Sequence, residues 1–158
     1  MKKRVLFVCL GNICRSPMAE GIFRHLVIDK GMSEEFEWDS AGVAGYHIGE
    51  NPDKRAISSA AKHDVELVSK GRQFRHADFD DFDVILAMDK SNYHHILALA
   101  GDNEKHRNKV HMMREFDDER DEMDVPDPYY GGQEGFENVY QMLYRSCNNL
   151  ISELNAES

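Results

Sequence analysis

Two short runs of consecutive apolar residues, 5–8 and 84–87, limit the possible folds of this chain more than any other feature. Each run is too short for a helix, and neither alternates with polar residues as a half-exposed strand would. Uninterrupted apolar strands of this kind occur in parallel sheets whose two faces are covered by helices. The sequence therefore predicts an α/β fold built on a parallel sheet.

The rest of the chain alternates between helical and strand patterns. Apolar residues keep helical spacing in four stretches, residues 17–31, 52–63, 91–99 and 133–154. Two further strands are predicted at residues 36–40 and 110–113. Ser16 and Ser91 are the predicted N-caps of the first and third helices, and Gly101 ends the third. This alternation predicts a doubly wound sheet in one domain, residues 1–158.

Charge and composition exclude several classes of protein. The formal net charge of -10 argues against nonspecific binding to nucleic acid or to an anionic membrane. No apolar run is long enough to span a membrane, and residues 5–9 are too short for the core of a signal peptide. The three cysteines are too few for a disulfide scaffold. We therefore expect a cytoplasmic protein with reduced thiols.

In a doubly wound sheet, ligands bind beyond the carboxyl ends of the strands. The residues predicted at those ends are Cys9, Ser40, Asp89 and Arg114. Residues 8–17, V-C-L-G-N-I-C-R-S-P, follow the first strand and lead into the first helix. The sequence therefore places this segment where a binding site is expected.

The segment after Cys9 has the composition of an anion-binding loop. Gly11 and Asn12 tolerate the positive φ of a tight turn, which points successive N–H groups into one concavity at the start of a helix. Arg15 adds a planar fork for two phosphate oxygens. The same surroundings stabilise a thiolate on Cys9, and Asn12 and Ser16 supply further hydrogen bonds. The predicted chemistry is attack of sulfur on phosphorus.

A simpler interpretation is that Cys9 is an inert core thiol and Arg15 a surface charge, since most buried cysteines are inert. That interpretation requires the placement of glycine, asparagine, arginine, serine and proline after Cys9 to be accidental. The combination between a strand and a helix favours the functional interpretation. The glycine-lysine-serine/threonine signature of nucleotide-binding phosphate loops is absent from the sequence.

Residues 114–132 are predicted to form a long acidic loop, and a loop of that length in a compact domain is usually functional. Its aspartates are Asp117, Asp118, Asp121, Asp124 and Asp127. Most charged runs are simply solvated, but Pro126 and Pro128 stiffen the backbone around Asp127. Expulsion of a phenolate is assisted by a positioned acid. From the residues alone, the interpretations of Asp127 as the positioned acid and as a solvated charge are equally supported.

Tyr129 and Tyr130 follow this aspartate and admit two interpretations, as packing aromatics or as walls of a slot for a phenyl ring. Tyr46 is a further candidate wall. Walls of this depth favour phosphotyrosine, because a phosphoserine would not reach the thiolate. The histidines show no metal-ligand spacing, so no metal and no cofactor are expected.

The sequence resembles the low-molecular-weight protein tyrosine phosphatases. The resemblance rests on residues 8–20, V-C-L-G-N-I-C-R-S-P-M-A-E, and on four further motifs: D-S-A-G at 39–42, P-D-K-R-A at 52–56, F-D-V-I-L-A-M-D at 82–89 and D-P-Y-Y-G at 127–131. The family resemblance implies a four-stranded parallel sheet with helices on both faces, a flavodoxin-like or Rossmann-like phosphatase fold. It also implies hydrolysis of phosphotyrosine and of small aryl phosphates.

The resemblance implies a role for each matching residue. Cys9 would be the nucleophile that forms a phosphocysteine, Arg15 the phosphate clamp and Asp127 the general acid and base. The phosphate would be bound by Leu10, Gly11, Asn12, Ile13, Cys14, Arg15 and Ser16, and the loop shaped by Asn12, Ser16 and Ser40. The substrate slot would be formed by Ile13, Tyr46, Tyr129 and Tyr130. Partners would be a phosphotyrosine protein and the product phosphate, with the enzyme a monomer or weak dimer.

The sequence leaves the roles of two residues, Cys14 and Ser69, open. Cys14 either packs beneath the loop or forms a reversible disulfide with an oxidised Cys9, as the resemblance favours. Ser69 falls where many family members carry a histidine, which leaves open how the network around Asn12 and Ser40 is completed. Cys147 lies on the apolar stripe of the last helix and is predicted to be a core residue.

Three other functions compete with the phosphotyrosine phosphatase. An arsenate reductase on this fold needs further cysteines to resolve its adduct, and downstream the chain has only Cys147. Protein arginine phosphatases resemble this loop but carry threonine at the position of Ile13 and lack the second tyrosine at Tyr130. A noncatalytic phosphate-binding module would not need Cys9, Arg15 and Asp127 together.

Overall fold

The structure, a computed structural model, describes residues 2–157 except the side chain of Tyr130. Four strands form one parallel sheet in the order β2-β1-β3-β4. They are β1 (Lys3–Cys9), β2 (Phe36–Gly42), β3 (Val84–Ala87) and β4 (Val110–Met112). The strand order reverses between β1 and β3, so the carboxyl end of β1 lies at the switch point of the sheet. The predicted doubly wound parallel sheet is confirmed.

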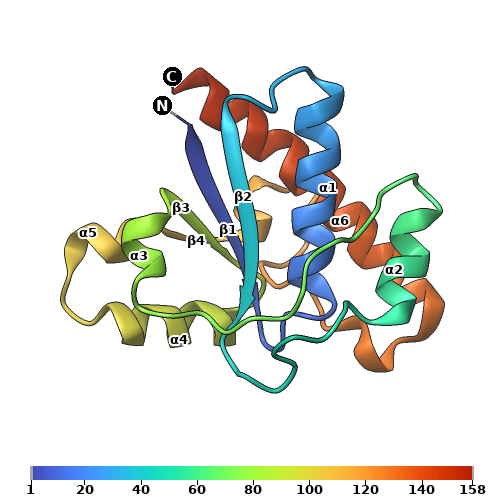
Figure 1. Ribbon diagram of the computed structural model, residues 1–158, viewed down its shortest axis with the longest axis horizontal. Helices are drawn as coiled ribbons and strands as arrows, with labels where there is room; N and C mark the ends of the chain where they lie inside the picture. Colours follow the sequence, from blue (N-terminus) through green and yellow to red (C-terminus); the bar gives the residue numbers. More distant parts are fainter. Residues whose placement is uncertain (1, 158) are drawn as a thin grey trace.

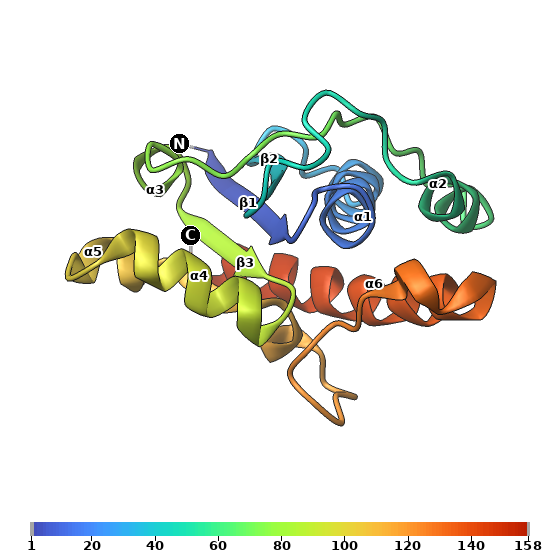
Figure 2. The same ribbon diagram turned by 90° about the horizontal axis from the view of Figure 1, so that it is seen from below.

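Helices cover both faces of the sheet, as the apolar strands predicted (Figures 1 and 2). On one face lie α1 (Arg15–Asp29), α2 (Lys54–Ala61) and α6 (Gly132–Ala156). On the other lie α3 (Asp78–Asp81), α4 (Lys90–Ala100) and α5 (Glu104–Arg107). Two 3₁₀ turns, η1 (Met113–Phe116) and η2 (Pro128–Tyr130), interrupt the long connection to α6.

The residues of β1 alternate between two separate cores. Val5 and Phe7 pack with α1 and α6, whereas Leu6 and Val8 pack with α3 and α4. All four side chains are fully buried, which explains why the run carries no polar residue. The central strand is therefore held from both sides, and its last residue, Cys9, is fixed in position.

Several boundaries differ from the prediction. The run 84–87 is a strand over its whole length, but the helix predicted at 52–63 is confined to Lys54–Ala61, and α3 and α5 were missed. Ser91 does not cap α4. Its N-cap is Asp89, whose side chain accepts from the N–H of Asn92. These corrections are local and leave the order of the main elements unchanged.

The predicted N-cap of α1 is also wrong. The helix begins at Arg15 with Cys14 at the N-cap position, and no side chain caps it. Ser16 lies inside the first turn, fully buried, and its hydroxyl is 3.0 Å from the sulfur of Cys9. The helix thus starts two residues earlier than it would with Ser16 as its N-cap, and its N-terminal end lies directly at the loop.

Candidate active site

Three carbonyl groups at the loop between β1 and α1 are bonded to a neighbouring segment of the chain. The carbonyl oxygens of Cys9, Leu10 and Ile13 accept hydrogen bonds from backbone N–H groups of residues 43–53, at 2.7 to 2.9 Å. Groups that would repel an anion are therefore already bonded to the neighbouring chain. Together with the N-terminal end of α1, this arrangement favours an oxyanion inside the loop.

Two residues allow the loop to close so tightly. Asn12 has a φ of 58°, in the left-handed region that asparagine adopts more readily than most residues. Gly42, at the end of β2, lies so close that a Cβ there would be 2.8 Å from the carbonyl oxygen of Leu10. A side chain at position 42 would push the loop outward. The role of Asn12 in the turn was expected, whereas that of Gly42 was not.

A chain of buried hydrogen bonds supports the thiol. Asn12 Nδ2 donates to Ser16 Oγ at 2.8 Å and to Ser40 Oγ at 3.0 Å. The Ser16 hydroxyl contacts Cys9 Sγ, and the Ser40 hydroxyl donates to Glu20 Oε1 at 2.6 Å. The predicted set of Asn12, Ser16 and Ser40 is thus brought together, although Ser40 lies within β2 and not at its end. Glu20 completes the set and was missed.

Glu20 is a buried carboxyl group with an unusual titration. Glu20 is only 8% exposed. Burial raises the pKa of Glu20 to about 7, against the opposing effect of the hydrogen bond from Ser40, which lowers it. A signal for it was present in the sequence, because Glu20 is four residues after Ser16 and so shares its helix face.

This pKa predicts a pH-dependent cost to stability. Between the ordinary value of 4.5 and the folded value of about 7, the folded state binds more protons than the unfolded state, so stability falls as pH rises. The variant Glu20→Gln lacks this titration. Its free energy of unfolding relative to wild type is expected to rise by about 3 kcal/mol between pH 4.5 and 7. Urea denaturation at several pH values measures this difference, and a difference that does not change with pH contradicts the expectation.

Arg15 is fixed before any ligand is present. Its Nη1 donates to Asp89 Oδ2 at 2.7 Å and to the carbonyl of Val125 at 2.9 Å. Burial alone would lower the pKa of Arg15, but Cys9 and Asp89 raise it above its ordinary value. Asp89 was predicted at a strand end without a role, and the structure makes it the partner that orients Arg15. Arg114, also predicted at a strand end, instead pairs with Asp117 and does not line the pocket.

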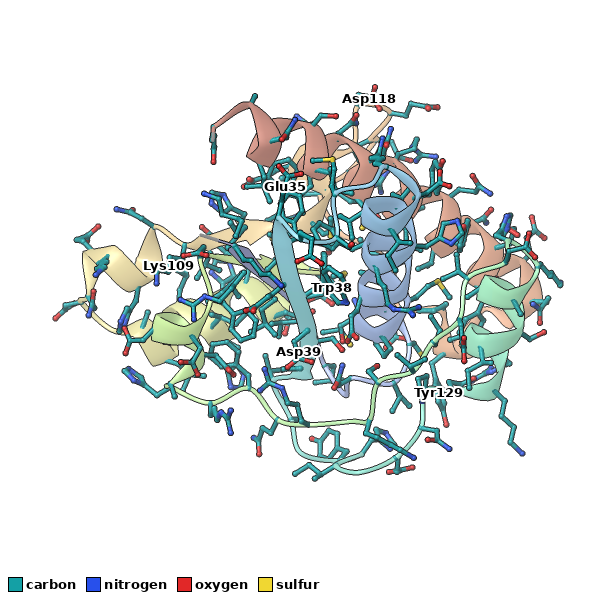
Figure 3. The ribbon with its side chains drawn as sticks, turned by 45° about the horizontal axis from the view of Figure 1, so that its top comes forward. Glu35, Trp38, Asp39, Lys109, Asp118 and Tyr129 are labelled. Atoms are coloured by element: carbon teal, nitrogen blue, oxygen red, sulfur yellow. The ribbon has the colours of Figure 1, made fainter. Side chains whose placement is uncertain are left out.

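The segment that carries Asp127 is anchored to the sheet and to Arg15. The N–H of Val125 donates to the carbonyl of Met88 at 2.7 Å, and the Val125 carbonyl accepts from Arg15. Asp127 Oδ1 accepts from the N–H of Tyr129, while its Oδ2 lies 4.0 Å from Arg15 Nη2. In Figure 3, Asp118 lies at the top edge of the molecule and Tyr129 lies well apart from it, in the lower half. Of the five aspartates in this loop, only Asp127 reaches the pocket.

These elements enclose a pocket of about 320 Å³. Its lining comprises Cys9, Leu10, Gly11, Ile13, Cys14, Arg15, Tyr46, His47, Asp127 and Tyr129. The nucleophile candidate, the arginine and the carboxylate predicted from the sequence therefore meet around one space. His47 was missed; it packs beside Gly11 and its Nδ1 lies 2.8 Å from Glu50 Oε2. The predicted wall Tyr130 has its side chain outside the described residues.

Tyr129 is held as a wall of the pocket by Arg55. The guanidinium lies 4.8 Å from the centre of the Tyr129 ring, and Arg55 Nη1 donates to the Tyr129 carbonyl at 2.7 Å. Asp53 in turn holds Arg55 through its carboxylate. This explains the spacing of aspartate and arginine in the segment P-D-K-R-A, because one orients the other toward the pocket.

Among the described residues, no group of three or more histidine, cysteine, aspartate or glutamate side chains is placed to hold a metal ion. Within the same part of the chain, no helix is both long and apolar enough to cross a membrane.

A thiol under the N-terminal end of a helix, with a fixed guanidinium beside it and a carboxylate above, suits chemistry at a tetrahedral oxyanion. On a doubly wound sheet, these features define the cysteine-dependent phosphatases as a class. Comparison with known proteins narrows the class. The family model for low molecular weight phosphotyrosine protein phosphatase matches residues 4–158.

Individual relatives agree with the family model. A Synechocystis protein, described as a candidate low molecular weight protein-tyrosine-phosphatase, is 44% identical over 154 residues, 98% of each chain. The human low molecular weight phosphotyrosine protein phosphatase is 40% identical over 151 residues, 96% of this chain and 95% of that one. This chain therefore belongs to the low molecular weight phosphotyrosine protein phosphatase family and is a hydrolase.

Solved structures show the same fold. A protein tyrosine phosphatase from Entamoeba histolytica, with Hepes in its active site, superimposes with a TM-score of 0.94 at 37% identity over 99% of both chains. A Drosophila arginine phosphatase superimposes with a TM-score of 0.88 at 33% identity over 98% of both chains. The four-stranded fold implied by the resemblance is thus confirmed.

Proposed function

We propose that the enzyme hydrolyses phosphotyrosine in proteins, and small aryl phosphates, in two steps through a phosphocysteine on Cys9. The observation that carries the proposal is the pocket itself, which has Cys9, Arg15, Asp127 and aromatic side chains around one space. The thiolate attacks phosphorus, and the bond from phosphorus to the phenolic oxygen breaks. Asp127 gives its proton to that oxygen, so the tyrosine leaves as a neutral phenol.

In the second step, water attacks the phosphocysteine. Asp127, now a carboxylate, takes a proton from the water, the sulfur–phosphorus bond breaks, and phosphate and thiolate result. Arg15 and the loop N–H groups of residues 10–16 hold the three outer oxygens through both steps. No residue is consumed, and the enzyme returns to its starting protonation.

The walls of the pocket support a flat aromatic substrate. Ile13, Tyr46 and Tyr129 line it, and Tyr129 is stacked against Arg55. A ring inserted between such walls is stabilised by apolar and aromatic contact. Cys9 is only 3% exposed at the base, so a substrate must be long enough to reach it. This supports phosphotyrosine over phosphoserine.

The likeness to an arginine phosphatase makes that activity the second candidate. The test compares kcat/KM for one peptide carrying phosphotyrosine, phosphoarginine or phosphoserine, with EDTA present throughout. We expect the phosphotyrosine peptide to be preferred by about 10²-fold or more. Equal or faster turnover of phosphoarginine would make the enzyme an arginine phosphatase, and a requirement for added metal would contradict the mechanism.

Arsenate reduction has less support. Cys147, the only cysteine downstream of the loop, is fully buried in α6 with its Sγ 3.6 Å from the Ala19 carbonyl oxygen, and burial raises the pKa of its thiol. The prediction that Cys147 is a core residue is confirmed. Cys147 does not line the pocket, whereas Cys14 does, so Cys147 is not placed to take over an adduct formed on Cys9.

We further propose that Cys14 protects Cys9 from irreversible oxidation. Both thiols are free and line the pocket, and burial raises the pKa of Cys14 to about 12, so Cys14 is a neutral thiol at pH 7. Hydrogen peroxide oxidises the Cys9 thiolate to a sulfenic acid and is itself reduced to water. The Cys14 sulfur then displaces the hydroxyl group, and a disulfide and water are formed.

The variant Cys14→Ser tests this protection. After treatment with peroxide, wild-type enzyme is expected to recover most of its activity with dithiothreitol, whereas the variant loses about tenfold more activity irreversibly. Mass spectrometry of the treated proteins identifies the disulfide or the sulfinic acid. Equal recovery of the two proteins would contradict the role of Cys14.

The free thiols also support a reducing, cytoplasmic location. Sedimentation would test the proposed monomer or weak dimer.

A further inference from the structure

Glu20 is the one buried ionisable group beside the described active-site loop to which the proposed reaction gives no role. It lies on α1 beneath the loop, and its carboxylate accepts the hydroxyl proton of Ser40 at 2.6 Å. The other groups that affect its charge are Asp39 on β2, labelled in Figure 3, Arg72, and the hydroxyl of Ser69. The hydrogen bond from Ser69, whose role the sequence left open, therefore lowers the pKa of Glu20 as the one from Ser40 does.

The direction of each hydrogen bond in this network can be assigned, starting from the bond between Arg72 and Asn12. The backbone N–H of Arg72 donates to Asn12 Oδ1 at 3.0 Å, which identifies the oxygen of the Asn12 amide. Asn12 Nδ2 must therefore donate both of its protons, one to Ser16 and one to Ser40. Both serine hydroxyls act as acceptors toward Asn12, so each must direct its own proton elsewhere.

The two serine protons have different destinations. That of Ser16 faces Cys9 Sγ at 3.0 Å and the Ala41 carbonyl at 3.4 Å, and a thiolate is the stronger and nearer acceptor. That of Ser40 goes to Glu20 Oε1. If Glu20 offered no acceptor, the buried Ser40 hydroxyl would rotate to find one, and Asn12 would lose a partner.

We propose that Glu20 is a positioning residue for the phosphatase reaction, which fixes Ser40 and thereby Asn12 and the hydrogen bond from Ser16 to the Cys9 thiolate. The proposal rests on the proposed role of Cys9 as nucleophile. Glu20 acts through Ser40 and does not touch the substrate. Glu20 ends the network beyond Ser40, and Ser69, the position that the sequence left open, also bonds to it.

Two variants separate hydrogen bonding from charge. Glu20→Gln and Glu20→Leu are both uncharged and similar in size, but only glutamine presents an acceptor to Ser40. We expect kcat/KM for p-nitrophenyl phosphate to be about tenfold lower in the leucine variant than in the glutamine variant. In a Ser40→Ala background, this difference is expected to disappear, because the group through which Glu20 acts is gone.

A second readout follows the thiol without turnover. The rate of Cys9 alkylation by iodoacetamide is measured against pH, and its midpoint is expected at higher pH in the leucine variant than in the glutamine variant. A purely structural role for Glu20 would lower the melting temperature of the leucine variant and leave this midpoint unchanged. Glu34→Gln, at an exposed glutamate, is the matched control and should behave as wild type.

The outcomes distinguish the two proposals. Equal kcat/KM and equal alkylation midpoints for the leucine and glutamine variants overturn the role of Glu20, as does a difference that persists in Ser40→Ala. If wild type alkylates at Cys9 but does not turn over phosphotyrosine, the proposed function fails and the alkylation comparison still decides about Glu20. Should the leucine variant not fold, Glu20→Met replaces it, since a thioether is a weak acceptor.

Discussion

Replacing Cys9 by serine is expected to lower kcat by about 10⁴-fold or more while phosphate binding persists. Serine keeps the size of the side chain and its contact with Ser16, but a neutral hydroxyl is a much weaker nucleophile than a thiolate. No other described group at the base of the pocket can replace it, because Cys14 is held as a neutral thiol. Assays with p-nitrophenyl phosphate measure the loss of turnover, and calorimetry with inorganic phosphate measures binding.

The control for this prediction is Cys147→Ala, which removes a thiol buried in the core and away from the pocket. Its kcat is expected to stay within about threefold of wild type, whatever its effect on stability. Turnover by Cys9→Ser within about tenfold of wild type would exclude Cys9 as the nucleophile. A failure to bind phosphate would show instead that the loop had been distorted.

Replacing Asp127 by asparagine is expected to lower kcat for phenyl phosphate by about 10²- to 10⁴-fold. The amide preserves the bond that the side-chain oxygen accepts from the Tyr129 N–H but cannot give a proton to the leaving oxygen. The loss should be at least about tenfold smaller for p-nitrophenyl phosphate, because an electron-poor phenolate leaves without protonation. The ratio of the two losses identifies the missing function as that of an acid.

Asp118→Asn is the matched control, since Asp118 is an exposed aspartate of the same loop and lies far from Tyr129 (Figure 3). It should not alter kcat for either substrate. Equal losses for phenyl and p-nitrophenyl phosphate in Asp127→Asn would mean that this carboxylate does not protonate the leaving group.

The long elements of the fold could be predicted because their patterns extend over several residues. The run 84–87 is a strand over its whole length, and the stripe on the last helix is buried as its spacing indicated. The four-residue helices α3 and α5 could not be predicted, because they are too short to show a period. The N-cap of α4 was predicted wrongly for a related reason. Either Asp89 or Ser91 can cap a helix at this place in the sequence, and tertiary contacts decide between them.

At the site, residues adjacent in sequence were easier to find than residues that meet only in space. Cys9 and Arg15 share one loop, so their chemistry could be predicted from spacing and then assigned by resemblance. Asp89 and Glu20 act through side chains of other elements, and each looks like an ordinary polar residue in its own segment. Only the packing of α1 against β2 shows why a glutamate can be buried there.

The fixed position of Arg15 has a consequence for the end of the reaction. Because Asp89 and Val125 already hold its side chain, an incoming phosphoryl group avoids an ordering cost of about 0.5–1.5 kcal/mol. Free phosphate carries the same oxygens and gains the same advantage, so the loop alone does not distinguish substrate from product. Product inhibition is therefore built into the loop, and the aromatic walls must supply the affinity by which a new substrate displaces the phosphate left by the last.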